Sequence, residues 1–290
     1  MGSGCRRQDA SRVSAASAPL AGSVNQKIPH RVITLTPSLS ELVFALGAGD
    51  RVVAVSDYCD YPEAVKALPR VGSFLSPAIE RILSLQPDLV LLDGVQGDAA
   101  TMLKQAGTHA VAVPMQDLAQ VRSAFTIVGA QLGDRQARAA ELLGELDRHL
   151  AAVSARTASQ PKRKTLFAVD RQIGSLRGLV VAGPGSYLDE LVRLAGGQNV
   201  FSDMAPRYAK VALEAIEERQ PDVILDAVHT DPENAAARRA DWNELRSVAA
   251  VRNGRVYVLA DRMFVTPGPR LGEALRQLAD LLHPPALTAR

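Results

Sequence analysis

Two segments far apart in the chain repeat the same pattern without a gap. Residues 76–93 read SPAIERILSLQPDLVLLD and residues 210–227 read KVALEAIEERQPDVILDA. Glu80 aligns with Glu214, and in both segments a Gln-Pro-Asp triplet separates a helical stretch from an apolar run. The shared pattern predicts a helix, a turn and a buried strand in each half of the chain. Two lobes of related topology are therefore expected.

A second match lies upstream of the first in each half of the chain. Residues 39–43 (LSELV) are similar to residues 188–192 (LDELV). Each segment belongs to a predicted helix that ends at a glycine, Gly47 in the first half and Gly196 in the second. The spacing between the two matches differs from one half to the other, so loops vary in length while the elements repeat.

Short β-branched runs alternate with helical stretches, which is typical of parallel strands joined by crossover helices. The fold class predicted is α/β, with two Rossmann-like lobes built on parallel sheets and a ligand cleft between them. The first predicted helix has Ser38 and Glu41 in capping-box spacing. Strands are expected at residues 31–35, 51–55, 89–92, 110–113, 165–169, 223–225 and 256–259, and helices at 38–46, from about Ser186, and at 272–282.

Between the two halves lies a segment, residues 117–160, that is almost entirely helical in pattern. Its second part, residues 134–157, would make a rod of about 36 Å at 1.5 Å per residue. A rod of that length is expected to brace both lobes and to allow only small lobe motions; packing on one lobe alone is the alternative. Its apolar stripe is Ala139, Leu143, Leu146, Leu150 and Val153. The predicted boundaries are a flexible tether (1–29), a first lobe (31–116), this linker and a second lobe (164–290).

The charge balance and the small number of cysteines exclude several classes of protein. The 33 basic and 31 acidic residues leave a net charge of +2 with no basic stripe, which argues against nucleic-acid binding. Two cysteines cannot supply a disulfide framework, a four-cysteine zinc site or an iron-sulfur cluster. The five histidines show no short repeated spacing, and no P-loop, nucleophile elbow or H-E-x-x-H motif is present. No metal ligand and no catalytic residue is predicted.

The N-terminal residues suggest a lipid attachment site. Met1-Gly2-Ser3 is typical of a segment left by cloning, and Gly4-Cys5 is what remains of a bacterial lipobox once the residues before it are removed. Cys5 is therefore predicted to carry a lipid, which would tether the protein to a membrane through residues 6–29. A plain tail cysteine is the alternative reading.

The loops that follow the predicted strands combine aromatic and charged side chains. In open α/β sheets ligands bind beyond the carboxyl ends of the strands, so these loops are the candidate binding site. Flat aromatic faces next to arginines and aspartates suit a large planar or polar ligand. For each residue alone, an ordinary surface loop is the alternative. The candidates are Pro37, Ser38, Tyr58, Phe74, Asp170, Arg171, Arg207, Tyr208, Asp261 and Arg262.

Over residues 31–284 the chain resembles the helix-bridged substrate-binding proteins of bacterial ABC importers for cobalamin, haem and iron-siderophores. The resemblance rests on RVITLTPSLSEL, VSDYCDYP, the paired E-x-I-x-x-x-x-P-D helices, GGQNVF at residues 196–201 and PGPRL at residues 267–271. It implies a monomeric, non-enzymatic protein of the periplasm or cell surface, without a cofactor. Such a protein would deliver a small-molecule ligand to a permease dimer with its ATPase.

Within that family the chain looks most like the cobalamin-binding branch. The resemblance places Tyr58, Phe74 and Tyr208 on three aromatic positions that line the corrinoid cleft. It departs from the branch where Val169 or Asp170, and Val180, stand in place of further aromatics.

Haem and siderophores remain alternative ligands. Haem binders that resemble this chain place a tyrosine iron ligand where Phe74 stands, and phenylalanine cannot coordinate iron, so haem ranks below a corrinoid. Siderophore binders hold anionic chelates with arginines, and Arg171, Arg207 and Arg262 would serve in that role. Cys59, beside Tyr58, is expected to be a small buried side chain, with a thiolate metal ligand as the alternative.

The resemblance also gives a role to Glu80 and Glu214. In the family, one glutamate on each lobe enters an arginine pocket on each permease subunit, which matches a two-fold symmetric partner. Exposed glutamates are common on helices, but these two fall at the same position of the internal repeat. They are the predicted permease-docking residues.

A two-lobed α/β enzyme with an interlobe active site is the rival class. A cluster-containing reductase would need several core cysteines, and only Cys59 lies in the folded part. A nucleotide-sugar enzyme would need a metal-binding Asp-x-Asp, whereas Asp57 and Asp60 are spaced too far apart.

Overall fold

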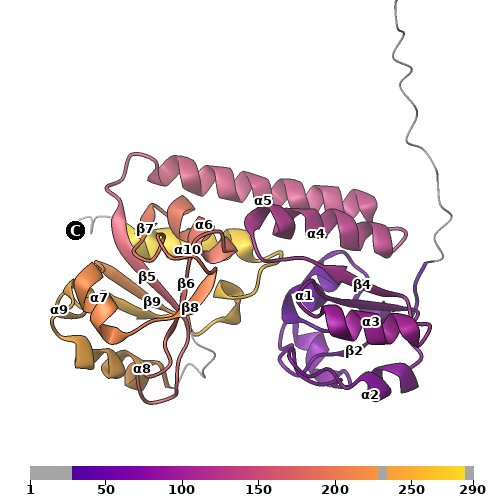
Figure 1. Ribbon diagram of the computed structural model, residues 1–290. Helices are drawn as coiled ribbons and strands as arrows, with labels where there is room; N and C mark the ends of the chain where they lie inside the picture. Colours follow the sequence, from indigo (N-terminus) through magenta and orange to yellow (C-terminus); the bar gives the residue numbers. More distant parts are fainter. Residues whose placement is uncertain (1–27, 228–233, 285–290) are drawn as a thin grey trace, which may run out of the picture.

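The computed structural model describes residues 28–227 and 234–284 and shows two α/β lobes joined by a long helix (Figure 1). The first lobe has a four-stranded parallel sheet in the order β2-β1-β3-β4. Its strands are β1 (Val32–Thr34), β2 (Val52–Val55), β3 (Leu89–Asp93) and β4 (Ala110–Val113), and its helices are α1 (Pro37–Ala45), α2 (Ile79–Ser84) and α3 (Gly97–Gln105). The predicted two-lobed α/β class is confirmed.

The sheet of the second lobe is mixed, so the expectation of two parallel sheets was wrong for this half. Its order is β10-β9-β5-β6-β8, with β7 also paired to β5, and β6 runs antiparallel to both β5 and β8. The connection between β5 and β6, residues 171–179, is too short for a crossover helix, so the chain turns back on itself. The strands are β5 (Arg163–Asp170), β6 (Val180–Ala182), β7 (Gly197–Asn199), β8 (Tyr208–Lys210), β9 (Val223–Asp226) and β10 (Val256–Val258), and the helices are α6 (Tyr187–Leu194), α7 (Leu213–Arg219), α8 (Ala235–Asp241), α9 (Ala249–Arg252) and α10 (Leu271–Leu282).

The internal repeat corresponds to the same local structure in both lobes. Helices α2 and α7 are each followed by a glutamine in the left-handed region, Gln86 at φ 47° and Gln220 at φ 46°. Non-glycine residues seldom adopt this conformation, so its recurrence at one position marks a common turn. The aspartate two residues later closes the turn: Asp88 accepts a bond from the Arg31 amide and Asp222 from the Lys164 amide.

Helices α4 (Leu118–Gln131) and α5 (Gln136–Thr157) connect the lobes. At 1.5 Å per residue, α5 is about 33 Å long, and Figure 1 shows it running over both lobes. It packs on α4 at one end and on α6 and α10 of the second lobe at the other. Its apolar residues join one core cluster that extends through both lobes. The buried stripe includes Leu142, while the predicted Leu143 is only half-buried.

The start of α1 differs from the predicted capping box. Thr36 is the N-cap and its hydroxyl accepts a bond from the Leu39 amide, because Pro37 fits the first helical position. Glu41 instead is buried, and Arg270 of the second lobe donates to both of its carboxylate oxygens at 2.6 and 2.9 Å. Burial raises the pKa of Glu41, and this ion pair joins the two lobes.

Within the described ranges, no helix combines the length and the apolar character that a membrane span requires.

Candidate functional site

A cavity of about 660 Å³ lies between the two lobes. It is found where the sheet geometry predicts, beyond the carboxyl ends of β1, β3 and β5. Both lobes contribute aromatic, apolar and carboxylate side chains to its surface. Its lining residues are Thr36, Pro37, Ser38, Tyr58, Phe74, Leu75, Asp93, Val95, Met115, Gln116, Asp170, Tyr187, Tyr208, Arg262, Val265, Thr266 and Pro267.

Most of the residues that the sequence predicted for ligand binding do line this cavity. Pro37 and Ser38 line it at the start of α1, and Tyr58 and Phe74 line it from loops of the first lobe. Three predicted residues of the second lobe also line the cavity: Asp170 at the end of β5, Tyr208 at the start of β8, and Arg262. The cavity thus brings together residues that are far apart in the sequence.

The backbone around Phe74 is fixed by its neighbours. The Gln96 side chain donates a 2.7 Å bond to the Phe74 carbonyl and accepts one from the Asp93 amide. The preceding Gly72 has φ +94°, and a Cβ there would lie 2.5 Å from the Ser76 carbonyl oxygen. Only glycine fits this turn, and the two Gln96 bonds fix the backbone that carries the aromatic ring.

Tyrosine side chains of the second lobe form the opposite side of the cavity. Tyr208 is half-buried, and burial raises its pKa to about 12. Tyr187 is almost completely buried at the start of α6, and burial raises its pKa well above the ordinary value. Both hydroxyls therefore stay protonated at neutral pH.

Sequence reasoning missed ten of the seventeen lining residues, among them Tyr187 and Asp93. Tyr187 immediately follows the N-cap Ser186, so the pattern marked it only as the beginning of a helix. Asp93 is the last residue of β3, one position beyond the predicted strand. Asp93 could have been identified by the rule that ligands bind at the carboxyl ends of strands, because it is the last residue of β3.

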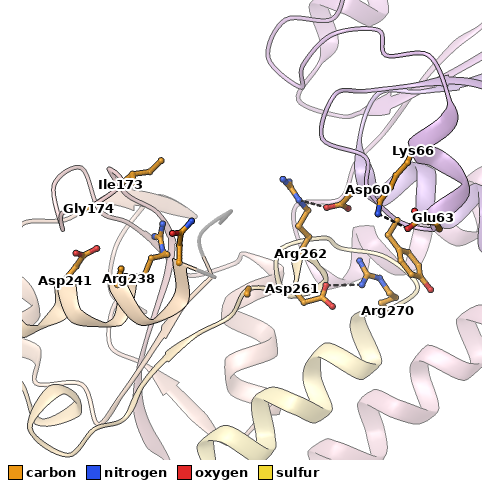
Figure 2. Close-up of a pocket in the computed structure, with 14 residues that line it drawn as sticks. Asp60, Glu63, Lys66, Ile173, Gly174, Arg238, Asp241, Asp261, Arg262 and Arg270 are labelled. Carbon is orange, nitrogen blue, oxygen red and sulfur yellow. Dashed lines mark hydrogen bonds and ion pairs between the residues drawn. The ribbon is translucent and has the colours of Figure 1, made fainter. Parts of the chain in front are cut away.

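Arg262 lines this cavity and also a second one of about 730 Å³ between the lobes. The residues that line the second cavity are drawn in Figure 2. The Arg262 guanidinium donates to Asp60 of the first lobe at 2.7 Å and lies 5.7 Å from the centre of the Tyr58 ring. The second cavity is lined mainly by charged side chains, and in Figure 2 dashed lines join Asp60 to Arg262 and Asp261 to Arg270.

Three predicted residues do not line the main cavity. Arg171 is turned into the interior of the second lobe, where it pairs with Asp226 and Asp241, so its assignment as a ligand contact is corrected. Arg207 donates to the Gly185 carbonyl and to Asp117, and it is not among the residues that line the cavity. Asp261 lines the second cavity and accepts bonds from the Met263 amide and from Arg270.

Cys59 is a buried thiol, as the preferred reading predicted. Its sulfur lies 3.1 Å from the Ser40 hydroxyl and 3.2 Å from the Ser56 hydroxyl, and burial raises the pKa of the thiol. Across residues 28–227 and 234–284 no group of three His, Cys, Asp or Glu side chains is placed to hold a metal ion.

We expect Cys59 to be unreactive in the folded protein. In a Cys5→Ser background at pH 8, labelling by a thiol reagent should be at least about 100-fold slower than in the denatured chain, because the thiolate is both rare and covered. Reaction at the denatured rate would contradict the burial.

Comparison with known proteins places these features in context. The model of the periplasmic binding protein family matches residues 32–263. An uncharacterized ABC transporter substrate-binding lipoprotein of Bacillus subtilis is 29% identical over 268 residues, covering 89% of this chain and 82% of the relative. A vitamin B12-binding protein of Yersinia pestis is 35% identical over 200 residues, covering 68% and 69%. A periplasmic heme-binding protein from Pseudomonas aeruginosa superposes with a TM-score of 0.78 at 27% identity, covering 90% and 94%.

Proposed function

This chain belongs to the periplasmic binding protein family, and we propose that it is the extracytoplasmic binding component of an ABC importer for a corrinoid. In this proposal cobalamin, or a close relative, binds between the lobes and is delivered to a permease. Because the family consists of transport proteins, no catalytic activity is proposed for the chain.

The aromatic lining of the interlobe cavity carries the proposal. Tyr58 and Phe74 contribute rings from the first lobe, and Tyr187 and Tyr208 contribute rings from the second. Large planar ligands are held by flat apolar walls with a few polar groups, and a corrinoid ring has both kinds of surface. Similarity to a vitamin B12-binding protein of Yersinia pestis supports the same ligand.

Haem is the second candidate, supported by the similarity to a heme-binding protein from Pseudomonas aeruginosa. The lining residues make it the weaker one. Phe74 offers no iron ligand, and burial raises the pKa values of Tyr187 and Tyr208, which opposes the deprotonation that iron coordination requires. Among the described tyrosines that line the cavity, this leaves the exposed phenol of Tyr58 as the one available iron ligand. An anionic siderophore is also disfavoured. Arg262 is the one basic residue among the described residues that line the cavity, and it is already paired with Asp60, which the siderophore would have to displace.

Calorimetric titration with three ligands tests the proposal. We expect cyanocobalamin to bind with a submicromolar Kd and to shift its visible spectrum, and haem and a ferric siderophore to bind more weakly, because shape and aromatic contact favour the corrinoid. Tighter binding of haem or of the siderophore would replace the corrinoid with that ligand.

For the permease contact we propose Glu80 and Glu214. Both are exposed, and each is the second residue of its helix, α2 in the first lobe and α7 in the second. Both helices are followed by a glutamine in the left-handed region, so the two carboxylates occupy the same position in the same local structure. A matched pair suits two equivalent basic pockets on a two-fold permease.

The proposed lipid attachment at Cys5 lies outside the described residues. It is supported by the similarity to a lipoprotein of Bacillus subtilis. Mass spectrometry of the native gene product tests this assignment, because an unmodified Cys5 would contradict lipid attachment there.

A further inference from the structure

Asp93 is a buried carboxylate that lines the interlobe cavity. It ends β3, a strand with neighbours on both sides, and only 6% of the residue is exposed. Its Oδ1 atom accepts bonds from the Val95 amide at 3.0 Å and from the Gln116 side chain at 3.2 Å. These bonds hold the carboxylate in one orientation.

The other oxygen, Oδ2, has no hydrogen-bond partner within residues 28–227 and 234–284, although the residue lines the cavity. Oδ2 is not completely covered by protein atoms, so a molecule in the cavity can reach it. Burial raises the pKa of Asp93, and the bonds from Val95 and Gln116 oppose that rise. A donor from a bound molecule would complete the hydrogen bonding of the carboxylate.

The charges around the cavity are predominantly negative. Its charged lining residues are Asp93, Asp170 and Arg262, and Arg262 is already paired with Asp60. The neighbouring Tyr187 and Tyr208 hydroxyls are neutral. A ligand carboxylate near Asp93 would therefore meet a like charge in a partly desolvated place.

We propose that Asp93 determines ligand specificity by accepting, at Oδ2, a hydrogen bond from an amide or hydroxyl group of the ligand and by disfavouring ligands with carboxylates there. The inference rests on the proposed function and extends it, because it names the peripheral chemistry of the ligand: neutral hydrogen-bond donors rather than acids. A buried charged acceptor discriminates strongly between the two, because a ligand acid at neutral pH has no proton to donate.

Two pairs of ligands that differ in charge test this role. The first pair is cyanocobalamin and the monocarboxylic acid made by hydrolysing one of its side-chain amides. The second is haem dimethyl ester and haem. The Asp93→Asn variant keeps the size of the side chain and an acceptor for Val95 and Gln116, but it removes the charge. Asp57→Asn is the matched control, because Asp57 is exposed and does not line the cavity. Circular dichroism checks that each variant is folded.

We expect the wild type to bind the uncharged member of a pair about tenfold or more tightly than the acid, and Asp93→Asn to reduce that ratio to about threefold or less. Asp57→Asn should keep the wild-type ratio. An unchanged ratio in Asp93→Asn, or a wild type that prefers the acid, would overturn the role of Asp93. Binding of the haem pair alone would refute the corrinoid, and because methyl esters have no N–H or O–H to donate, its ratio would then test only whether Asp93 disfavours carboxylates. Binding of neither pair would overturn both.

Discussion

Replacing Arg171 with alanine is expected to lower the free energy of unfolding by about 3–5 kcal/mol, the cost of breaking a buried ion pair from one side. The side chain of Arg171 is completely buried. It donates to Asp226 at 2.9 and 3.1 Å and to Asp241 at 2.7 Å, and it also donates to the carbonyl oxygens of Ser175 and Arg238.

The loss would be severe because Asp226 is also completely buried. Without Arg171 it would keep only a 3.4 Å contact with Arg238 and a bond from the Trp242 indole. These groups join the end of β9 to α8 and to the loop after β5. Without them, three segments of the second lobe would lose their common polar contact.

Urea denaturation followed by circular dichroism measures the effect. Arg138→Ala is the control, since Arg138 makes an exposed pair with Glu141 and should cost less than about 1 kcal/mol. If the two variants lost equal stability, the buried cluster would not be holding the lobe together. Where Arg171→Ala remains folded, its ligand affinity should be unchanged, because Arg171 does not line the cavity.

The sequence predicted the parts of the fold that rest on local patterns. The repeat around Glu80 and Glu214, the Gln-Pro-Asp turns and the long stripe of α5 all have a fixed spacing along the chain. Such spacings are set by helix and strand periodicity, so they can be read without knowing the rest of the structure.

The errors arose where the position of a side chain depends on residues far away in the sequence. Arg171 follows a strand, as a cleft residue does, but its partners Asp226 and Asp241 lie 55 and 70 positions away and draw it inward. Nothing local distinguishes it from Arg262, whose side chain does reach the cavity. The strands β6, β7 and β8 were not predicted, because each is only three residues long and too short to show an alternating pattern.

The double variant Glu80→Ala/Glu214→Ala is expected to abolish uptake of the ligand by whole cells. Each single variant should reduce uptake at least about tenfold, because removing one side of a desolvated charge pair at an interface costs about 2–5 kcal/mol. Neither glutamate lines the interlobe cavity, so ligand affinity should stay at the wild-type value. Uptake of cobalt-labelled cyanocobalamin and calorimetry on the purified variants measure the two quantities separately.

Glu218→Ala provides the control, since Glu218 is also exposed on α7 but lies outside the repeated pair. It carries the same charge on the same helix, so normal uptake in this variant would exclude a general effect of charge. Two results would refute the docking role: normal uptake by the double variant, or a loss of affinity that accounts for the loss of uptake. A defect confined to one of the two glutamates would instead show that the permease contacts the lobes unequally, which would contradict the two-fold arrangement inferred from the repeat.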